Sequence, residues 1–92
     1  MVARFSTATI TTTPGALELL AFFGTSPLDL IRRHFSGEWG GDADNGRVNE
    51  RYLRHGAGML LSIFRVGEER VWVISHIGGA DAYTTVLLPG EY

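Results

Sequence analysis

The spacing of apolar residues divides the chain into a helical first half and a β-rich second half. Up to residue 55, apolar positions recur at helical intervals inside segments that begin with Ser/Thr-Pro or Asp and end at glycine. From residue 59 onward, apolar runs are separated by short turns that contain glycine, which is the pattern of strands in a meander. Helices followed by a run of strands predict an α+β domain.

Two short helices are predicted by a shared pattern of start and stop residues. Thr13 and Ser26 are suitable N-caps, and each is followed by proline at the first helical position. Gly24 and Gly37 are suitable stop residues. The expected core positions are Leu17, Leu20, Ala21 and Phe23 in the first helix, and Leu28, Ile31 and Phe35 in the second.

A third helix is predicted from about Asp44 to His55, with Asp42 or Asp44 as its N-cap. Arginines recur along one side of this helix, on the side away from its apolar residues. Such a stripe could contact phosphates, but any soluble helix places charge on its solvated side, and we favour that second interpretation. The stripe consists of Arg47, Arg51 and Arg54.

Three strands are predicted over residues 59–66, 70–77 and 82–89, and residues 5–12 form either a short edge strand or an ordered arm. We expect a single α+β domain over residues 1–92, with two or three N-terminal helices on an antiparallel meander. The meander has three strands, or four if the N-terminal segment joins it. Because the strands are apolar on both faces, the face without helices should bind a partner or a second copy.

Composition narrows the partner. The formal net charge of −2 over 92 residues argues against general electrostatic binding of nucleic acid, so a protein partner or a homodimer is favoured. The chain has no cysteine, which excludes disulfides and thiolate metal sites. No apolar run approaches the roughly 20 residues of a membrane span, and no secretory signal is visible. We expect a cytoplasmic protein with no membrane partner, no metal and no cofactor.

The segment RRHFSGEWGG, residues 32–41, concentrates candidate binding residues. Trp39 could anchor a partner, because tryptophan is enriched at binding hot spots. It could equally fold back as a plug over the core, and we favour the plug. The candidate binding residues are Trp39, Arg33, Glu38, Trp72 and Tyr83.

The three histidines lie on different predicted elements, and none has metal-ligand spacing. A metal-independent RNase or toxin-like domain needs a base, an acid and a cation for the phosphate, which His34, His55, His76, Arg33 and Thr85 could supply. Helix ends readily accept histidine, so we favour a non-catalytic reading and assign no catalytic residue. An enzyme predicts histidines that meet in one cleft, whereas an interaction protein predicts scattered histidines and a flat apolar or mixed patch.

The motifs TPGALELL, RHFSGEWG, VNERYLRHG, LLSIFRV, VWVIS and TTVLLPGEY follow one another between Thr13 and Tyr92. In this order the chain resembles a family of small uncharacterised bacterial proteins carried on plasmids and integrative elements. Members often carry an acidic-Arg-Ser segment before the paired threonines, whereas residues 80–83 read Ala-Asp-Ala-Tyr. The resemblance implies a mobile-element interaction protein that modulates host defence, as antirestriction or anti-CRISPR proteins do. An RNase-like domain and a structural homodimeric module are the alternatives.

Overall fold

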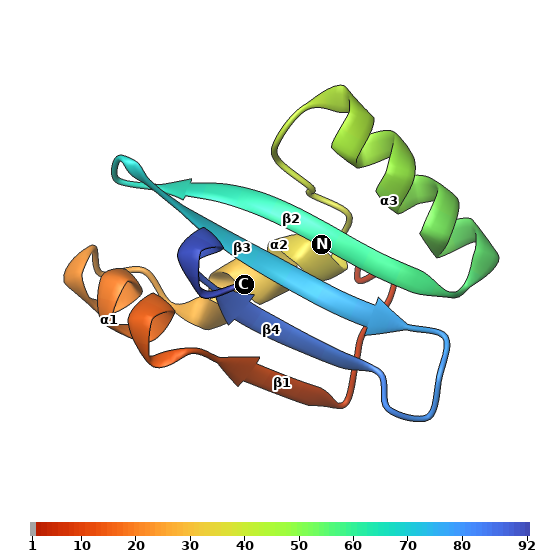
Figure 1. The fold of residues 1–92 in the computed structure, drawn as a ribbon, viewed down its shortest axis with the longest axis horizontal. Coiled ribbons are helices and arrows are strands. Elements are labelled where there is room, and N and C mark those ends of the chain that lie inside the picture. Colours follow the sequence, from red (N-terminus) through yellow and green to blue (C-terminus); the bar gives the residue numbers. More distant parts are fainter. Residues whose placement is uncertain (1) are drawn as a thin grey trace.

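The computed structural model describes residues 2–92. Figure 1 shows helices gathered around one four-stranded sheet. In the described residues the elements are β1 (Thr9–Thr12), α1 (Pro14–Phe22), α2 (Pro27–Phe35), α3 (Ala43–His55), β2 (Gly58–Val66), β3 (Glu69–Ile77), β4 (Tyr83–Leu87) and the 3-10 turn η1 (Pro89–Glu91). The predicted α+β fold is confirmed, with one strand ahead of the helices.

The sheet has the strand order β1-β4-β3-β2. The strands β2, β3 and β4 form the predicted antiparallel meander. The fourth strand also forms, but β1 pairs with β4 in parallel, with Thr9 opposite Tyr83 and Thr12 opposite Val86. The sheet is therefore mixed, and the expectation of a purely antiparallel sheet was wrong for this strand. A parallel pair needs a long crossover, and here the three helices and two other strands supply it.

Side-chain caps set the starts of the three helices. The hydroxyl of Thr13 accepts from the backbone N–H of Ala16 at 3.2 Å, and Ser26 caps α2 through the N–H of Leu28. Asp42 caps α3, which begins one residue earlier than predicted. The Ser/Thr-Pro starts read from the sequence are therefore confirmed. Because caps satisfy free N–H groups, they fix where the chain leaves each turn.

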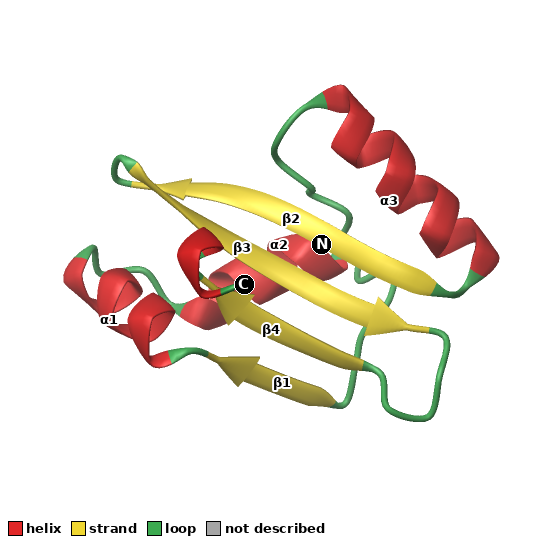
Figure 2. Cartoon of the chain, viewed as in Figure 1, coloured by secondary structure: helices red, strands yellow, loops and turns green. Residues whose placement is uncertain are grey.

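The helices surround the sheet in different ways, as Figure 2 shows. Helix α2 crosses one face of the sheet, which we call the inner face, α1 lies at one end of the sheet, and α3 runs beside β2. The opposite side is the open face. The main core lies between α2, α1 and the inner face, and consists of Ala16, Leu20, Leu30, Ile31, Phe64, Val66, Val71, Val73 and Val86.

The expected core positions of the first two helices were partly wrong. Leu17, Phe23 and Leu28 are 51%, 43% and 48% exposed. The reason is that α1 touches the sheet end with one side only, where Ala16 and Leu20 are buried. Helix α2 buries a stripe shifted around its axis, which consists of Leu30, Ile31 and His34.

Candidate functional site

His34 is fully buried at the centre of the inner face. Its Nδ1 lies 2.6 Å from the hydroxyl of Ser62 on β2, and its Nε2 lies 2.8 Å from that of Ser75 on β3. The hydroxyl of Ser62 also lies 3.0 Å from the backbone carbonyl of Glu38. Burial lowers the pKa of His34 to about 3. The ring is therefore neutral near pH 7, and His34 is not a cation that complements the end of its helix, since desolvation outweighs the helix dipole.

The chain of hydroxyls continues across the sheet. The hydroxyl of Ser75 lies 2.6 Å from that of Thr84 on β4, which lies 2.6 Å from that of Thr7. The hydroxyl of Thr7 also lies 3.1 Å from the backbone carbonyl of Thr9. We call His34, these four hydroxyls and the two carbonyls the His34 network. It joins α2 to three strands and to the segment before β1, and its burial keeps every hydroxyl in it from a dissolved substrate.

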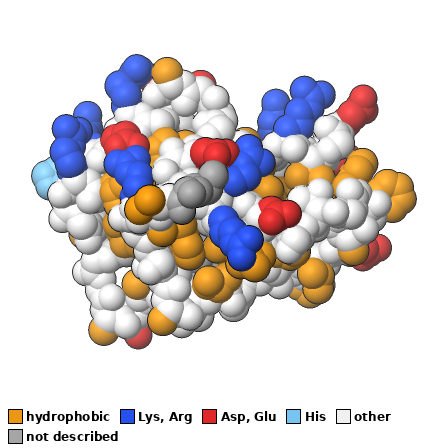
Figure 3. All heavy atoms as spheres, turned by 180° about the vertical axis from the view of Figure 1, so that it is seen from behind, with side chains coloured by type: hydrophobic (Ala, Val, Ile, Leu, Met, Phe, Trp, Pro, Cys, Tyr) orange, Lys and Arg blue, Asp and Glu red, His pale blue; other side chains and the backbone are white. Residues whose placement is uncertain are grey.

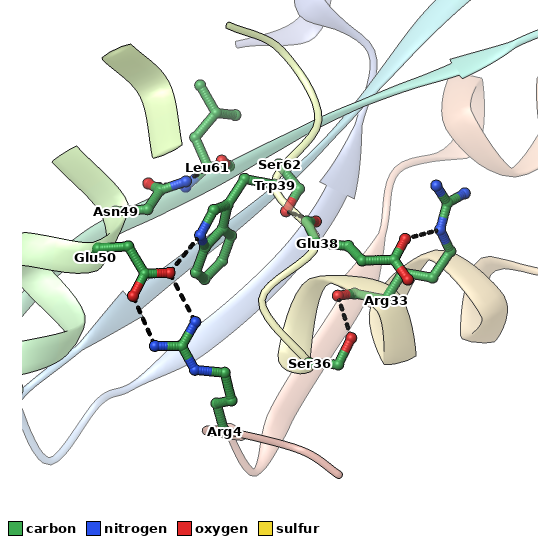
Figure 4. Close-up of polar contacts among 9 residues, drawn as sticks. All are labelled: Arg4, Arg33, Ser36, Glu38, Trp39, Asn49, Glu50, Leu61 and Ser62. Carbon is green, nitrogen blue, oxygen red and sulfur yellow. Dashed lines mark hydrogen bonds and ion pairs between the residues drawn. The ribbon is translucent and has the colours of Figure 1, made fainter. Parts of the chain in front are cut away.

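Trp39 lies in the core beside this network and is 8% exposed. Its ring N–H donates to a carboxylate oxygen of Glu50 at 2.9 Å. The guanidinium of Arg4 donates two hydrogen bonds of 2.7 Å to the same carboxylate (Figure 4). The hydrogen bonds from Arg4 and then Trp39 lower the pKa of Glu50 to about 2. Trp39 therefore acts as a plug in this structure, and its ring is not presented to a partner.

The edge of β2 is covered by polar groups from outside the sheet. The side-chain amide of Asn49, which is 1% exposed, donates to the carbonyl of Leu61 at 2.6 Å and accepts from its N–H at 3.0 Å. The N–H of Ile63 donates to the carbonyl of Trp39 at 2.8 Å. Gly40 has a φ of 62° and passes so close to Ile63 that any side chain would collide with its carbonyl. These contacts remove the edge that other strands could otherwise extend.

Arg33 and Glu38 satisfy each other at the surface. The Nε of Arg33 donates to the carboxylate of Glu38 at 2.7 Å, and both side chains remain nearly half exposed. The Arg33 guanidinium also lies 4.4 Å from the ring centroid of Phe64. In the stripe on α3, Arg47 pairs with Asp44 and stays exposed, as expected for a solvated helix side. Exposed pairs of this kind contribute little to stability.

The catalytic candidates are not brought together. His34 lies on the inner face and His76 is exposed on the open face, so the sheet separates them. His55 ends α3, while Thr85 lies on the open face with its hydroxyl 3.1 Å from that of Thr11. Arg33 is committed to its own ion pair. Within residues 2–92, no group of three or more His, Asp or Glu side chains is arranged to hold a metal ion.

The open face carries aromatic and aliphatic side chains. Trp72 and Tyr83 both lie here, and the ring of Tyr83 stacks on that of His76 at 4.8 Å. Tyr92, which follows η1, lies over part of the face with its ring 5.8 Å from that of Trp72. The face is therefore partly covered by the chain itself. Its apolar residues are Met59, Leu61, Ile63, Trp72, Ile74, Tyr83 and Leu87.

Sequence reasoning missed a group of exposed apolar residues where α1 turns into α2. Phe22 is 81% exposed, and its ring lies 5.0 Å from that of Phe23. Seen from the α2 side, apolar side chains gather at the end of the molecule where α1 lies (Figure 3). The signal in the sequence is that Glu18 is the only charged residue of α1. We call this group the apolar corner; it consists of Leu17, Phe22, Phe23 and Leu28.

Two broader findings complete the description. Across residues 2–92, no helix is both long enough and apolar enough to cross a membrane. Compared with known proteins, the chain matches no protein-family model, no curated protein and no solved structure. The resemblance to plasmid-borne proteins therefore stays a prediction.

Proposed function

We propose that this chain is a small cytoplasmic interaction protein of a bacterial mobile element, which binds a protein partner through the apolar corner and modulates host defence. The exposure of the apolar corner carries the proposal, since Phe22 is 81% exposed on a helix with one charged residue. A helix that is apolar all round is normally buried. Contiguous apolar surface on a small soluble domain marks an interaction site.

The corner is held rigidly, which favours binding. Phe23 packs against Gly67 in the turn between β2 and β3, so closely that any side chain at Gly67 would collide with the ring. Leu20, on the opposite side of α1, is completely buried in the core. Both anchors hold the neighbouring Phe22 outward before any partner arrives. A preorganised side chain loses less conformational entropy on binding than a mobile one.

The scatter of the histidines favours an interaction protein over the RNase-like alternative. An RNase-like domain would need a base, an acid and a cation that binds the phosphate, all within reach of one substrate. His34 is buried, His76 lies on the other side of the sheet, and Arg33 is paired with Glu38. The proposed activity is therefore binding without catalysis.

The proposal is tested by capture of a partner from bacterial lysate with matched surface variants. Leu17→Ser/Phe22→Ser removes two of the four side chains of the apolar corner. The control Val48→Ser/Tyr52→Ser removes two partly exposed side chains from α3, which are 44% and 38% exposed. We expect one protein to be retained by the native chain and by the α3 variant, and to be lost with the corner variant. Equal retention by all three would contradict the proposal.

Light scattering after size exclusion separates a foreign partner from a second copy. The proposal predicts a monomer for the native chain and for both variants. A dimer that becomes monomeric only in Leu17→Ser/Phe22→Ser would show that the corner binds itself. That result would favour the structural homodimeric alternative over a foreign protein partner.

A further inference from the structure

Two arginines face each other on the open face of the sheet. Arg65 on β2 and Arg70 on β3 are directly opposite in the register, and both are exposed. Like charges in this position destabilise a strand pair. The ion pairs within residues 2–92 use other arginines, namely Arg4, Arg33 and Arg47. The two guanidinium groups thus form a positive site whose planar donors suit a phosphate.

A hollow beside this arginine pair brings an aromatic ring next to the positive charge. It is lined by Arg65, Arg70, Trp72 and Ile63, together with Asp42 and its neighbour Gly41. The carboxylate of Asp42 accepts the N–H of residue 45 at 2.8 Å as the cap of α3. One oxygen of that carboxylate is therefore engaged by the protein, and no ion pair within residues 2–92 joins an acid to Arg65 or Arg70.

A second hollow, of about 240 Å³, lies further along the same face. It is lined by the stacked pair His76 and Tyr83, by Tyr92, and by apolar Ile74 and Leu87. Aromatic rings around an apolar floor fit the flat face of an unpaired nucleobase, and every nucleobase has such a face.

The one acid that lines this second hollow, Glu91, is hydrogen-bonded to other groups of the protein. Glu91 accepts the hydroxyl of Thr13 at 2.6 Å and the N–H of Leu88 at 2.8 Å. These hydrogen bonds lower the pKa of Glu91, and they hold its carboxylate at the start of α1. Its charge is therefore partly satisfied within the protein, which reduces its repulsion of a phosphate.

We infer that the open face binds single-stranded nucleic acid, with bases stacked on Trp72, Tyr83 and Tyr92 and a backbone phosphate held by Arg65 and Arg70. From Arg70 to His76 the strand β3 extends about 20 Å, which joins both hollows into one track. Paired bases cannot reach these rings, so the ligand is single-stranded. This surface is separate from the apolar corner, and the inference does not depend on the proposed protein partner.

Fluorescence anisotropy with a labelled oligouridylate of about 10 nucleotides tests this inference. We expect saturable binding at low salt with quenching of tryptophan emission, and a slope of log affinity against log salt of about −0.7 for the one phosphate that the two arginines hold. Arg65→Gln/Arg70→Gln should weaken binding about tenfold. The matched variant Arg51→Gln/Arg54→Gln removes the same charge from α3 and should bind like the native chain.

A second matched pair tests the stacking. Tyr83 and Tyr52 are both 38% exposed, but only Tyr83 lies on the open face. Tyr83→Ala should weaken binding about fivefold or more, and Tyr52→Ala should not change it. If Tyr83→Ala fails to fold, as judged by circular dichroism, Tyr92→Ala replaces it, since Tyr92 is 72% exposed.

Three results would overturn the inference. These are absence of binding at low salt, equal losses in the two double-arginine variants, and equal or tighter binding of a duplex of the same length. Phe22→Ser should bind the oligonucleotide like the native chain, because the apolar corner is not involved. A failure of the nucleic-acid inference is thus visible separately from a failure of the proposed protein interaction.

Discussion

The two faces of the sheet are built from alternate residues of the same strands, yet the inner face buries polar side chains within its apolar core, whereas the open face leaves aromatic rings in contact with solvent. On the inner face Ser62, Ser75 and Thr84 are completely buried. On the open face the half-buried Trp72 and the 38% exposed Tyr83 remain in contact with solvent. Polarity alone would place these residues the other way round. The difference arises because His34 on α2 bonds to Ser62 and Ser75, and Ser75 bonds to Thr84. On the open face only η1 and Tyr92 cover part of the strands.

This contrast teaches that the inner face includes a buried polar network centred on His34 within its apolar core, whereas the open face contains no such network in the described residues. Buried polar groups are tolerated only when they are hydrogen-bonded. Removal of His34 should therefore affect every strand of the meander. Removal of an open-face ring should affect binding while leaving most of the fold intact.

The largest expected effect is that of His34→Ala. It creates a cavity and leaves the hydroxyls of Ser62 and Ser75 without their partner, so we expect a loss of about 4 kcal/mol in the free energy of unfolding. Trp72→Leu on the open face should cost only about 1 kcal/mol, because the ring is half-buried and its replacement is apolar. Urea denaturation measures both. Similar losses for the two variants would remove the distinction between the faces.

The second largest expected effect is a fall in the free energy of unfolding at acidic pH, because His34 is buried on the inner face. The pKa of His34 falls from 6.5 to about 3 in the folded chain, so the unfolded chain takes up this proton at higher pH. Stability from this group is complete above pH 6.5 and is lost as the pH falls towards 3. Between pH 6.5 and 4.5 we expect a loss of about 2 kcal/mol in the free energy of unfolding.

The control for this pH dependence is His34→Gln, which should lose much less stability over the same interval than the native chain. The interval excludes Glu50, whose pKa is lowered from 4.5 to about 2, so its contribution is lost only below pH 4.5. An unchanged slope in His34→Gln would show that His34 is not the group that titrates.

A substitution beside the edge strand β2 should lower the free energy of unfolding by a smaller amount. Asn49→Ala leaves the N–H of Leu61 without a partner, while the carbonyl of Leu61 keeps the side-chain amide of Asn45 at 3.0 Å. We therefore expect a loss of about 1 kcal/mol in the free energy of unfolding. Hydrogen exchange should become faster at the N–H of Leu61 than at Val73, which lies in the middle of the sheet. Faster exchange at both sites alike would indicate global destabilisation and no specific role at the edge.

The smallest expected effect on stability is that of Phe22→Ser. With 81% of Phe22 exposed, we expect a change within about 0.5 kcal/mol in the free energy of unfolding. Thermal denaturation measures this change. A loss above about 1 kcal/mol would mean that the ring contributes to the core, and the corner would then be weaker support for a binding site.

The local elements were accessible from the sequence because local rules decide them. Thr13-Pro14 and Ser26-Pro27 give caps and first turns directly. The meander follows from three apolar runs separated by short turns. The parallel pairing of Thr9–Thr12 with β4 was not accessible, since it joins segments more than 70 residues apart and is carried by threonines without an apolar alternation.

The site was less accessible than the fold. His34 ends a helix beside two arginines, where a cation is expected. Only the three-dimensional structure, in which both ring nitrogens of His34 contact the hydroxyls of Ser62 and Ser75, shows that it is a buried neutral ring. Trp39 was correctly favoured as a plug. Phe22 was missed because the sequence does not show which side of α1 touches the sheet.

The His34 network also holds fewer hydrogens than contacts. Four hydroxyls and one neutral ring supply five hydrogens for six contacts. The shortage falls on the longest contacts, which end at the carbonyls of Thr9, at 3.1 Å, and Glu38, at 3.0 Å. With the ring hydrogen on Nδ1, the carbonyl of Thr9 receives no hydrogen bond from the network. With the ring hydrogen on Nε2, the carbonyl of Glu38 receives none. The tautomer of one buried ring therefore sets the direction of every hydroxyl across three strands. The backbone carbonyls of Thr9, at the start of β1, and Glu38, after α2, compete for a single hydrogen.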